Sequence, residues 1–290
     1  MPETFWTHTV WYLALLALTI IMIAIAQSKA DNRRFLTAYS MAVLGVYYLF
    51  EYVLVVLLDA YQYHPMLLPN DPFQDTVFGN VFSQTSIAAS CMLIISLRLR
   101  PVWYFVFAAA YYLIELLFVY LGIYVLHWYK TIFTPIVLVV LYWAARRVHN
   151  AAVATHSRAG DNAIILFGAL ALFANTAIMP FKLLKIHVFT GGFFADPSRD
   201  HTATALLYGI IFIGALVSIR KSSLKQGWKA LLMACLYLAQ YAAFKAGLMT
   251  FANGWFPWAT LLEIAVCFLW IILMDRLVRM RRPASDGLPK

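Results

Sequence analysis

Four ionisable residues lie in otherwise apolar stretches at nearly even intervals. Glu51, Glu115, Lys182 and Lys245 are separated by 64, 67 and 63 residues. An ionised side chain inside a membrane is costly unless it is paired or hydrated, so such residues usually mark a functional site. A carboxylate there can exchange protons or hold a cation, and a lysine can neutralise it or bind an anion. The spacing therefore predicts a polar site to which repeated segments each contribute a charge.

Further polar groups lie on the same helix faces, because residues three and four positions apart share a face. Tyr48 and Tyr112 each precede a glutamate by three residues, and Tyr241 precedes Lys245 by four. Counting along the helices at about 1.5 Å per residue places Glu263 at a similar depth. We expect Lys245 to pair with one of the glutamates. The predicted substrate- or ion-binding residues are Glu51, Glu115, Glu263, Lys245, Tyr48, Tyr112, Tyr241 and Gln84.

The composition is that of a polytopic membrane protein. Of the 290 residues, 63% are hydrophobic and only 12% are charged, with a mean hydropathy of +0.76. A soluble domain carries about 25% charged residues, so soluble classes are excluded. The chain is expected to be one all-α transmembrane domain, residues 1–290. Its predicted spans are 9–27, 36–58, 78–97, 102–126, 131–146, 163–184, 202–219, 229–250 and 257–275.

The basic residues predict how the nine spans are oriented. Most of the 22 Lys and Arg residues fall in alternate connections, and short cytoplasmic loops carry such an excess. This predicts an outside N-terminus and an inside C-terminus. The same asymmetry accounts for the net charge of +9 without nucleic acid as a partner. The lipid bilayer is the expected partner.

An internal repeat is visible at an offset of 64 residues. The segment 47–51, Tyr-Tyr-Leu-Phe-Glu, matches 111–115, Tyr-Tyr-Leu-Ile-Glu, and Phe181-Lys182 matches Phe244-Lys245 at an offset of 63. Such repeats build many transporter folds. They predict a first helix followed by four helical hairpins, at about 36–97, 102–157, 163–225 and 229–282. Aromatic-rich helices also resemble one another without common origin, which is the alternative for the lysine pair.

One stretch resembles known sequences. Glu115-Leu116-Leu117-Phe118, followed by Leu121-Gly122-Ile123-Tyr124 and His127-Trp128, resembles uncharacterised multi-pass membrane proteins of spore-forming bacteria over about 20 residues. The resemblance implies residence in a bacterial inner membrane and supplies no activity or catalytic residue.

The favoured function is a small-solute or ion-coupled transporter with an outward-biased Glu/Lys site. The first alternative is a sensor or chromophore-binding protein in which Lys245 forms a Schiff base with an aldehyde such as retinal. A second is an intramembrane enzyme that uses a carboxylate with His64 or His127. A third is an assembly factor whose charges only lock helices together. No known catalytic motif or metal-ligand spacing occurs, so no metal site is predicted, and the cofactor and the catalytic residues are left open.

Overall fold

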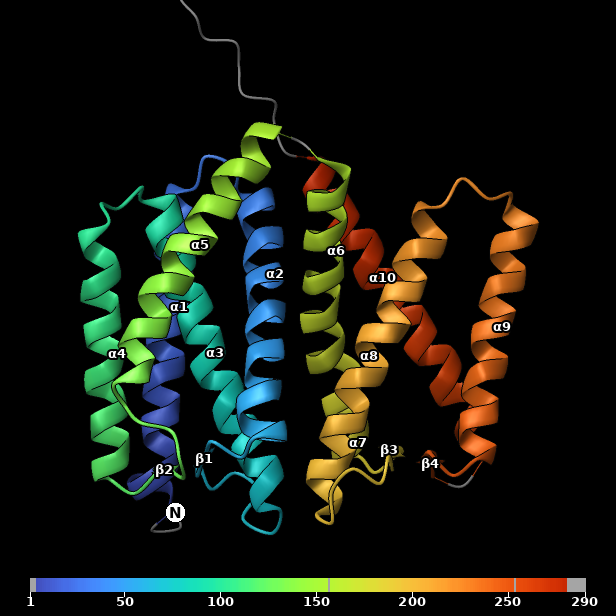
Figure 1. The fold of residues 1–290 in the computed structure, drawn as a ribbon, viewed down its shortest axis with the longest axis horizontal. Coiled ribbons are helices and arrows are strands. Elements are labelled where there is room, and N and C mark those ends of the chain that lie inside the picture. Colours follow the sequence, from blue (N-terminus) through green and yellow to red (C-terminus); the bar gives the residue numbers. More distant parts are fainter. Residues whose placement is uncertain (1–3, 156, 253, 281–290) are drawn as a thin grey trace, which may run out of the picture.

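The computed structural model describes residues 4–155, 157–252 and 254–280 as a bundle of long helices (Figure 1). The helices are α1 (Val10–Lys29), α2 (Arg33–Glu51), α3 (Pro72–Ser96), α4 (Val102–Tyr120), α5 (Phe133–Thr155), α6 (Arg158–Phe173), α7 (Met179–Leu183), α8 (Pro197–Lys221), α9 (Gln226–Lys245) and α10 (Phe256–Arg279). Three π-helical segments adjoin them: η1 (Phe5–Thr9), η2 (Tyr52–Leu57) and η3 (Ala174–Ile178). Four short strands are β1 (Tyr61–Tyr63), β2 (Tyr124–Leu126), β3 (His187–Phe189) and β4 (Met249–Phe251).

Seven helical stretches in the described part of the chain are long and apolar enough to cross a membrane. They are Phe5–Lys29, Arg33–Leu57, Pro72–Ser96, Val102–Tyr120, Phe133–Thr155, Arg158–Leu183 and Pro197–Lys221. A helical membrane protein is therefore indicated. Helices α9 and α10, of 20 and 24 residues, run beside these seven. The count of nine spans and the orientation in the membrane stay predictions.

Several predicted boundaries differ from the structure for local reasons. The fourth span ends at Tyr120 rather than 126, because the chain turns at Gly122, with φ 70°, and enters β2. The fifth helix continues to Thr155 rather than ending at 146. Arginines lower the hydropathy at that point, yet they are good helix formers. The strands were not predicted, because three residues are too few to show an alternating pattern.

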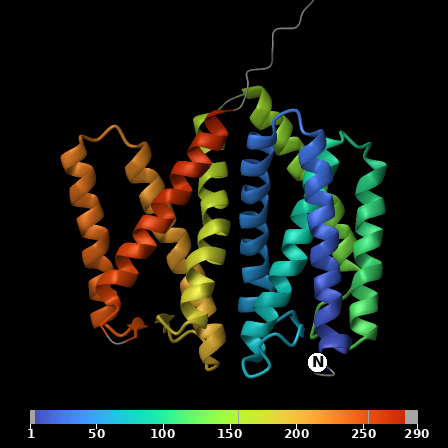
Figure 2. The same ribbon diagram turned by 180° about the vertical axis from the view of Figure 1, so that it is seen from behind.

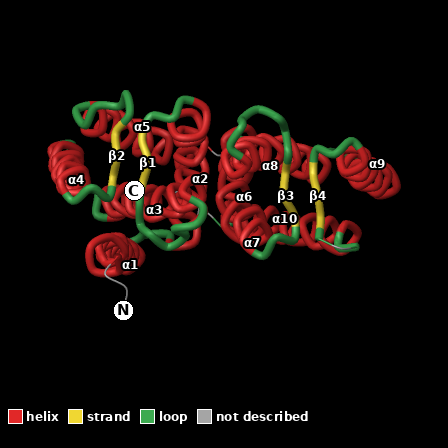
Figure 3. The backbone as a smooth tube through the Cα atoms, turned by 90° about the horizontal axis from the view of Figure 1, so that it is seen from below, coloured by secondary structure: helices red, strands yellow, loops and turns green. Residues whose placement is uncertain are grey.

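All four strands lie at one end of the bundle, which we call the strand end (Figure 1). The other end, where α2 begins and α3 connects to α4, is called the basic end. Antiparallel pairing joins β1 to β2 and β3 to β4, and Tyr63 stacks on Tyr124 with ring centroids 4.7 Å apart. Seen from the strand end, the two pairs lie on either side of α2 and α6 (Figure 3).

The two halves of the chain follow the same order of elements. From α2 to α5, and from α6 to α10, a long helix with a π-segment leads to a strand, two helices, a second strand and a last helix; the second half has in addition the short α7 before its first strand. A short motif recurs 125 residues apart, Asp71-Pro72 with Asp75 and Asp196-Pro197 with Asp200. Each strand pair therefore lies within one half of the chain, and each half is about twice as long as one predicted hairpin. An origin in four equivalent hairpins stays a prediction.

The recurring motif starts α3 and α8 in the same way. Asp71 and Asp196 cap their helices by accepting the N–H groups of Gln74 and Arg199, at 3.0 and 2.7 Å. The second aspartate reaches back to the preceding loop. Asp75 accepts the N–H groups of residues 66, 67 and 68, and Asp200 accepts those of residues 191, 192, 193 and 194. Both loops at the strand end are thereby fixed to the bundle.

Close contact between α2 and α6 holds the two halves together. Both helices run through the middle of the bundle (Figure 2). A Cβ at Gly45, on α2, would collide with the carbonyl oxygen of Phe167, on α6. Gly168 of α6 instead faces the end of Met274, on α10. Only glycine allows this approach, because the opposing atoms at residue 45 are backbone atoms that cannot move aside.

Replacing Gly45 with alanine should therefore destabilise the protein. Overpacking a fixed contact costs about 1–3 kcal/mol, so we expect Gly45→Ala to unfold at a lower temperature in detergent. The matched control is Gly214→Ala on α8, where an added Cβ meets no atom within 4 Å. Equal melting temperatures for the wild type and Gly45→Ala would contradict the importance of this contact.

Candidate functional site

Glu51 is a buried carboxylate with two well-defined side-chain partners. It ends α2, where the helix changes into η2, and its exposed fraction is 5%. The hydroxyl of Tyr61 donates to Oε2 and the amide of Gln84 donates to Oε1, both at 2.6 Å. Two short, charge-assisted hydrogen bonds can hold an ionised carboxylate in a buried position. Gln84, predicted from the sequence, is thus a direct partner of Glu51.

A small cavity beside Glu51 also contains Glu115. We call it the tyrosine cavity; it has a volume of about 80 Å³ and lies within the first half of the chain. One carboxylate oxygen of Glu115, Oε1, is buried with no hydrogen-bond partner among the described residues. The polar lining residues are Glu51, Tyr61, Tyr63, Ser83, Gln84, Tyr111, Glu115, Tyr124, Tyr129 and Thr134.

The tyrosines at the strand end of this cavity stay protonated. Burial, together with the charge of Glu51, raises the pKa of Tyr61 well above its usual value. Burial likewise raises the pKa of Tyr129 to about 12. A protonated phenol donates its hydrogen, so Tyr61 remains a donor to Glu51 throughout the physiological range.

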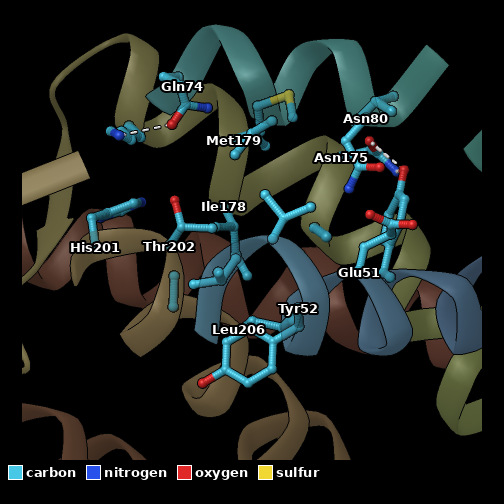
Figure 4. A pocket seen from close by; sticks show the side chains of 18 residues that line it. Glu51, Tyr52, Gln74, Asn80, Asn175, Ile178, Met179, His201, Thr202 and Leu206 are labelled. Atoms are coloured by element: carbon cyan, nitrogen blue, oxygen red, sulfur yellow. Dashed lines mark hydrogen bonds between the residues drawn. The ribbon is translucent and has the colours of Figure 1, made fainter. Parts of the chain in front are cut away.

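A second cavity, the central cavity, lies between the two halves (Figure 4). Its volume is about 100 Å³, which is room for several water molecules or a small solute. Glu51 lines this cavity as well, so the same carboxylate borders both. Figure 4 shows Glu51, Asn80 and Asn175 at one end and Gln74 and His201 at the other. The polar lining residues are Tyr48, Glu51, Tyr52, Gln74, Asn80, Asn175, Lys182, His201 and Thr202.

Lys182, on α7, is the basic residue of the central cavity. Its Nζ donates to Oε1 of Gln74 at 2.7 Å and lies 3.6 Å from a carboxylate oxygen of Asp71. The same oxygen of Asp71 accepts the hydroxyl of Ser198 at 2.6 Å. Although burial acts in the opposite direction, these hydrogen bonds and the lysine charge hold the pKa of Asp71 below its usual value. Asp71 therefore keeps Lys182 in place without fully occupying its three donors.

Tyr48 connects the halves at this cavity. Its hydroxyl lies 2.8 Å from Nδ2 and 3.1 Å from Oδ1 of the Asn175 side chain, which belongs to η3. Both long central helices change from α- to π-geometry where they pass the cavity, at η2 and η3. Pro180 follows η3 closely. π-segments are frequent at functional sites, and they leave backbone carbonyls without regular helical partners.

Glu263 belongs to a separate cluster in the second half of the chain. Its carboxylate lies 2.6 Å from Nδ1 of His187 and 3.2 Å from the hydroxyl of Tyr208, which in turn accepts the amide of Gln240. Glu263 lines neither cavity. The sequence prediction placed Glu263 in the same site as Glu51, and the structure does not bring them together.

Lys245 is also outside the site, contrary to the predicted pairing. It ends α9 with an exposed side chain over the rings of Tyr241 and Phe244, at 5.5 and 5.9 Å. Among the described residues, no ion pair joins it to a carboxylate. The helix end places the ammonium where it can remain hydrated, so it has no need of a buried partner. Tyr112 and Tyr241 line neither cavity.

The histidines of the enzyme alternative do not reach these cavities either. His127 lies 3.3 Å from Asp59 and 2.8 Å from its carbonyl oxygen, and His64 lines neither cavity. Within the part of the chain that the structure describes, no three His, Cys, Asp or Glu side chains gather to hold a metal ion.

Lys182 replaces Lys245 as the lysine of the site. The even spacing of charges did include Lys182, whereas Asp71, Gln74 and His201 carried no signal of their own. The motif shared by Asp71 and Asp196 could have located the loops that deliver them.

Comparison with known proteins identifies no relative, since no family model, curated protein or solved structure matches the chain. The resemblance to proteins of spore-forming bacteria stays a prediction. A proposal about function must therefore come from the geometry of the two cavities.

Removing the Glu51 carboxylate should destabilise the protein. Glu51→Leu leaves the hydroxyl of Tyr61 buried without an acceptor, at a cost of about 1–3 kcal/mol. It leaves the amide of Gln84 with only the longer bond to Oδ1 of Asn80, at 3.3 Å. Glu51→Gln retains one acceptor oxygen and should lose less. Thermal unfolding in detergent measures both. If Glu51→Leu is as stable as Glu51→Gln, the hydrogen bonds from Tyr61 and Gln84 to Glu51 do not stabilise the protein.

The charge of Asp71 should make stability depend on pH. A lowered pKa in the folded state gives stabilisation that is present above the unfolded value of about 3.9 and is lost as pH falls through the folded value. Asp71→Asn keeps the helix cap and removes the charge. We expect it to be less stable than the wild type by up to about 1 kcal/mol at pH 6, a difference that shrinks as the pH falls below the unfolded value of about 3.9. A difference that is constant with pH would contradict this.

Proposed function

We propose that the protein carries a small anionic solute, such as a monocarboxylate, together with a proton. The central cavity holds the solute and Glu51 holds the proton. The observation that supports this most directly is that Glu51 borders both cavities, one with Lys182 and the other with Glu115. Because Glu51 lines both cavities, binding of a solute in the central cavity can be coupled to proton exchange between Glu51 and the tyrosine cavity.

The charges of the central cavity favour an anion. The positive charge is that of Lys182, which contacts Gln74 at one end, and the three donors of a lysine exceed the hydrogen bonds that Gln74 and Asp71 accept. His201, at the same end, accepts the N–H of Phe189 at Nδ1 and is therefore a neutral imidazole (Figure 4). Amide groups at the other end, from Asn80 and Asn175, can bind neutral polar atoms. A proton on Glu51 would offset the negative charge of the solute, so the pair would move without net charge.

The position of the cavity is consistent with alternating access. It lies between two halves with the same order of elements, and in many carriers the substrate lies between such repeats. The π-segments η2 and η3 flank it, and a break in regular helix geometry is where a long helix bends most easily. Movement of one half against the other would open the cavity toward one side at a time.

Uptake of lactate into proteoliposomes tests the proposal. With an inward proton gradient, we expect the protein to take up radiolabelled lactate and to prefer it over methylammonium. Losing a charge-assisted hydrogen bond of about 1.5 kcal/mol slows a step about ten-fold, so Glu51→Gln and Lys182→Gln should reduce uptake by at least that much.

The matched control is Lys185→Gln, which removes an exposed lysine three residues along the chain. It should leave uptake unchanged. The proposal is wrong if lactate enters no faster than into protein-free liposomes, or if both Glu51→Gln and Lys182→Gln take it up at the wild-type rate.

A further inference from the structure

Four buried hydroxyl groups form a column beyond the tyrosine cavity, on its side toward the basic end. Ser86 and Ser90 lie one turn apart on α3, Tyr111 lies on α4 and Tyr142 lies on α5. The hydroxyl oxygens of Ser86 and Tyr111 are 2.8 Å apart, as are those of Ser90 and Tyr142. All four side chains are buried, with an exposed fraction of 8% for Tyr111 and 0% for the others.

Tyr111 connects this column to the acidic groups. It lines the tyrosine cavity together with Glu115, which lies one turn away on the same helix. Its hydroxyl contacts Ser86, and Ser86 and Ser90 lie one turn apart on α3, so the two oxygen pairs are neighbours on one helix face. The order from the cavity is therefore Glu115, Tyr111 with Ser86, then Ser90 with Tyr142.

The column extends toward the basic end. Along α4, the eleven residues from Glu115 to Tyr104 correspond to about 16 Å at 1.5 Å per residue, which is roughly half of a 30 Å hydrocarbon core. At its end, Arg146 lies one turn beyond Tyr142 on α5. It donates to the hydroxyl of Tyr104, at 3.2 Å, and to the carbonyl oxygen of Leu99.

The simpler explanation is that these hydroxyls only join helices. Two observations favour an additional role for these hydroxyls. The positions of α8 that match Ser86 and Ser90, 125 residues on, are Ile211 and Ala215, so packing of the equivalent helix needs no hydroxyl there. In each oxygen pair either atom can be the donor, and Ser90 also has the carbonyl oxygen of Ile87 as an acceptor at 2.8 Å. Each hydroxyl can thus both donate and accept, which is the property that proton transfer along a chain requires.

We propose that Tyr111, Ser86, Ser90 and Tyr142 relay protons between Glu115 and the basic end. This rests on the proposed function, because it supplies the route by which the coupled proton leaves. In each step one hydroxyl oxygen accepts a proton and releases its own hydrogen to the next oxygen. One proton leaves the carboxyl group of Glu115 and one reaches water at the basic end. The hydroxyl groups return to neutral, and Glu115 is a carboxylate until it takes up the next proton from the cavity.

Arg146 controls the exit of this relay. A fixed guanidinium charge at the end of a narrow path repels an excess proton, as arginine does in pores that exclude protons. Its position one turn from Tyr142 would prevent continuous leakage, so that release waits for a change in the position of the α5 segment. Arg146→Gln should therefore increase proton flux in the absence of solute.

Two measurements separate the relay from solute binding. Lactate exchange across proteoliposomes needs no net release of a proton, whereas net uptake with internal acidification, followed by an enclosed pH dye, does. Tyr111→Phe and Tyr142→Phe remove one hydroxyl oxygen each and keep the ring. We expect both to exchange lactate like the wild type and to slow net uptake and acidification about ten-fold or more, the scale of a lost proton-transfer group.

The matched control is Tyr120→Phe, the same change on the same helix at a residue that is 86% exposed. It should alter neither measurement. Normal acidification in Tyr111→Phe and Tyr142→Phe, with Glu51→Gln still impaired, would overturn the relay and leave the proposed function standing. Absence of lactate exchange by the wild type would overturn both. Retained exchange in the phenylalanine variants also shows that they fold.

Discussion

The architecture depends on the close approach of α2 and α6. Gly45 faces the backbone of Phe167, so a side chain at Gly45 would separate the two helices, whereas Gly168 of α6 faces Met274 of α10. This contact fixes how the two halves meet. Beyond it, toward the strand end, both helices change to π-geometry, and the central cavity lies at that level. The cavity therefore exists because tight packing on one side is followed by irregular helix geometry on the other.

Each half then places one strand residue against one buried carboxylate. Tyr61 starts β1 and bonds to Glu51, while His187 starts β3 and bonds to Glu263. A buried carboxylate without such partners would be costly in a low-dielectric interior, so the strands stabilise the acidic groups as well as closing the helix connections. The partner residue differs between the halves, and so does its chemistry. A tyrosine only donates here, whereas a histidine can also hold a proton.

The two halves share an order of elements but divide their polar groups unequally. The first half contains the tyrosine cavity and the hydroxyl column, and the second contributes Lys182, Asn175 and His201 to the central cavity. In the proposed mechanism, the first half handles the proton and the second half completes the solute site. Glu51 lies at the boundary, which is why the coupling proposal centres on that residue.

The sequence alone determined the class of protein and the positions of its long helices. Composition and runs of apolar residues depend on local chemistry, so they indicated a helical membrane protein and recovered helices such as α2 and α8. It also identified Glu51, Glu115 and Gln84, because polar residues in apolar helices are conspicuous. Only the tertiary structure decided which charges meet. Lys182 rather than Lys245 shares a cavity with Glu51, and Glu263 lies apart. The rotation of each helix about its axis and the glycine contact between α2 and α6 decide which helix faces converge. Spacing along the chain encodes neither of these.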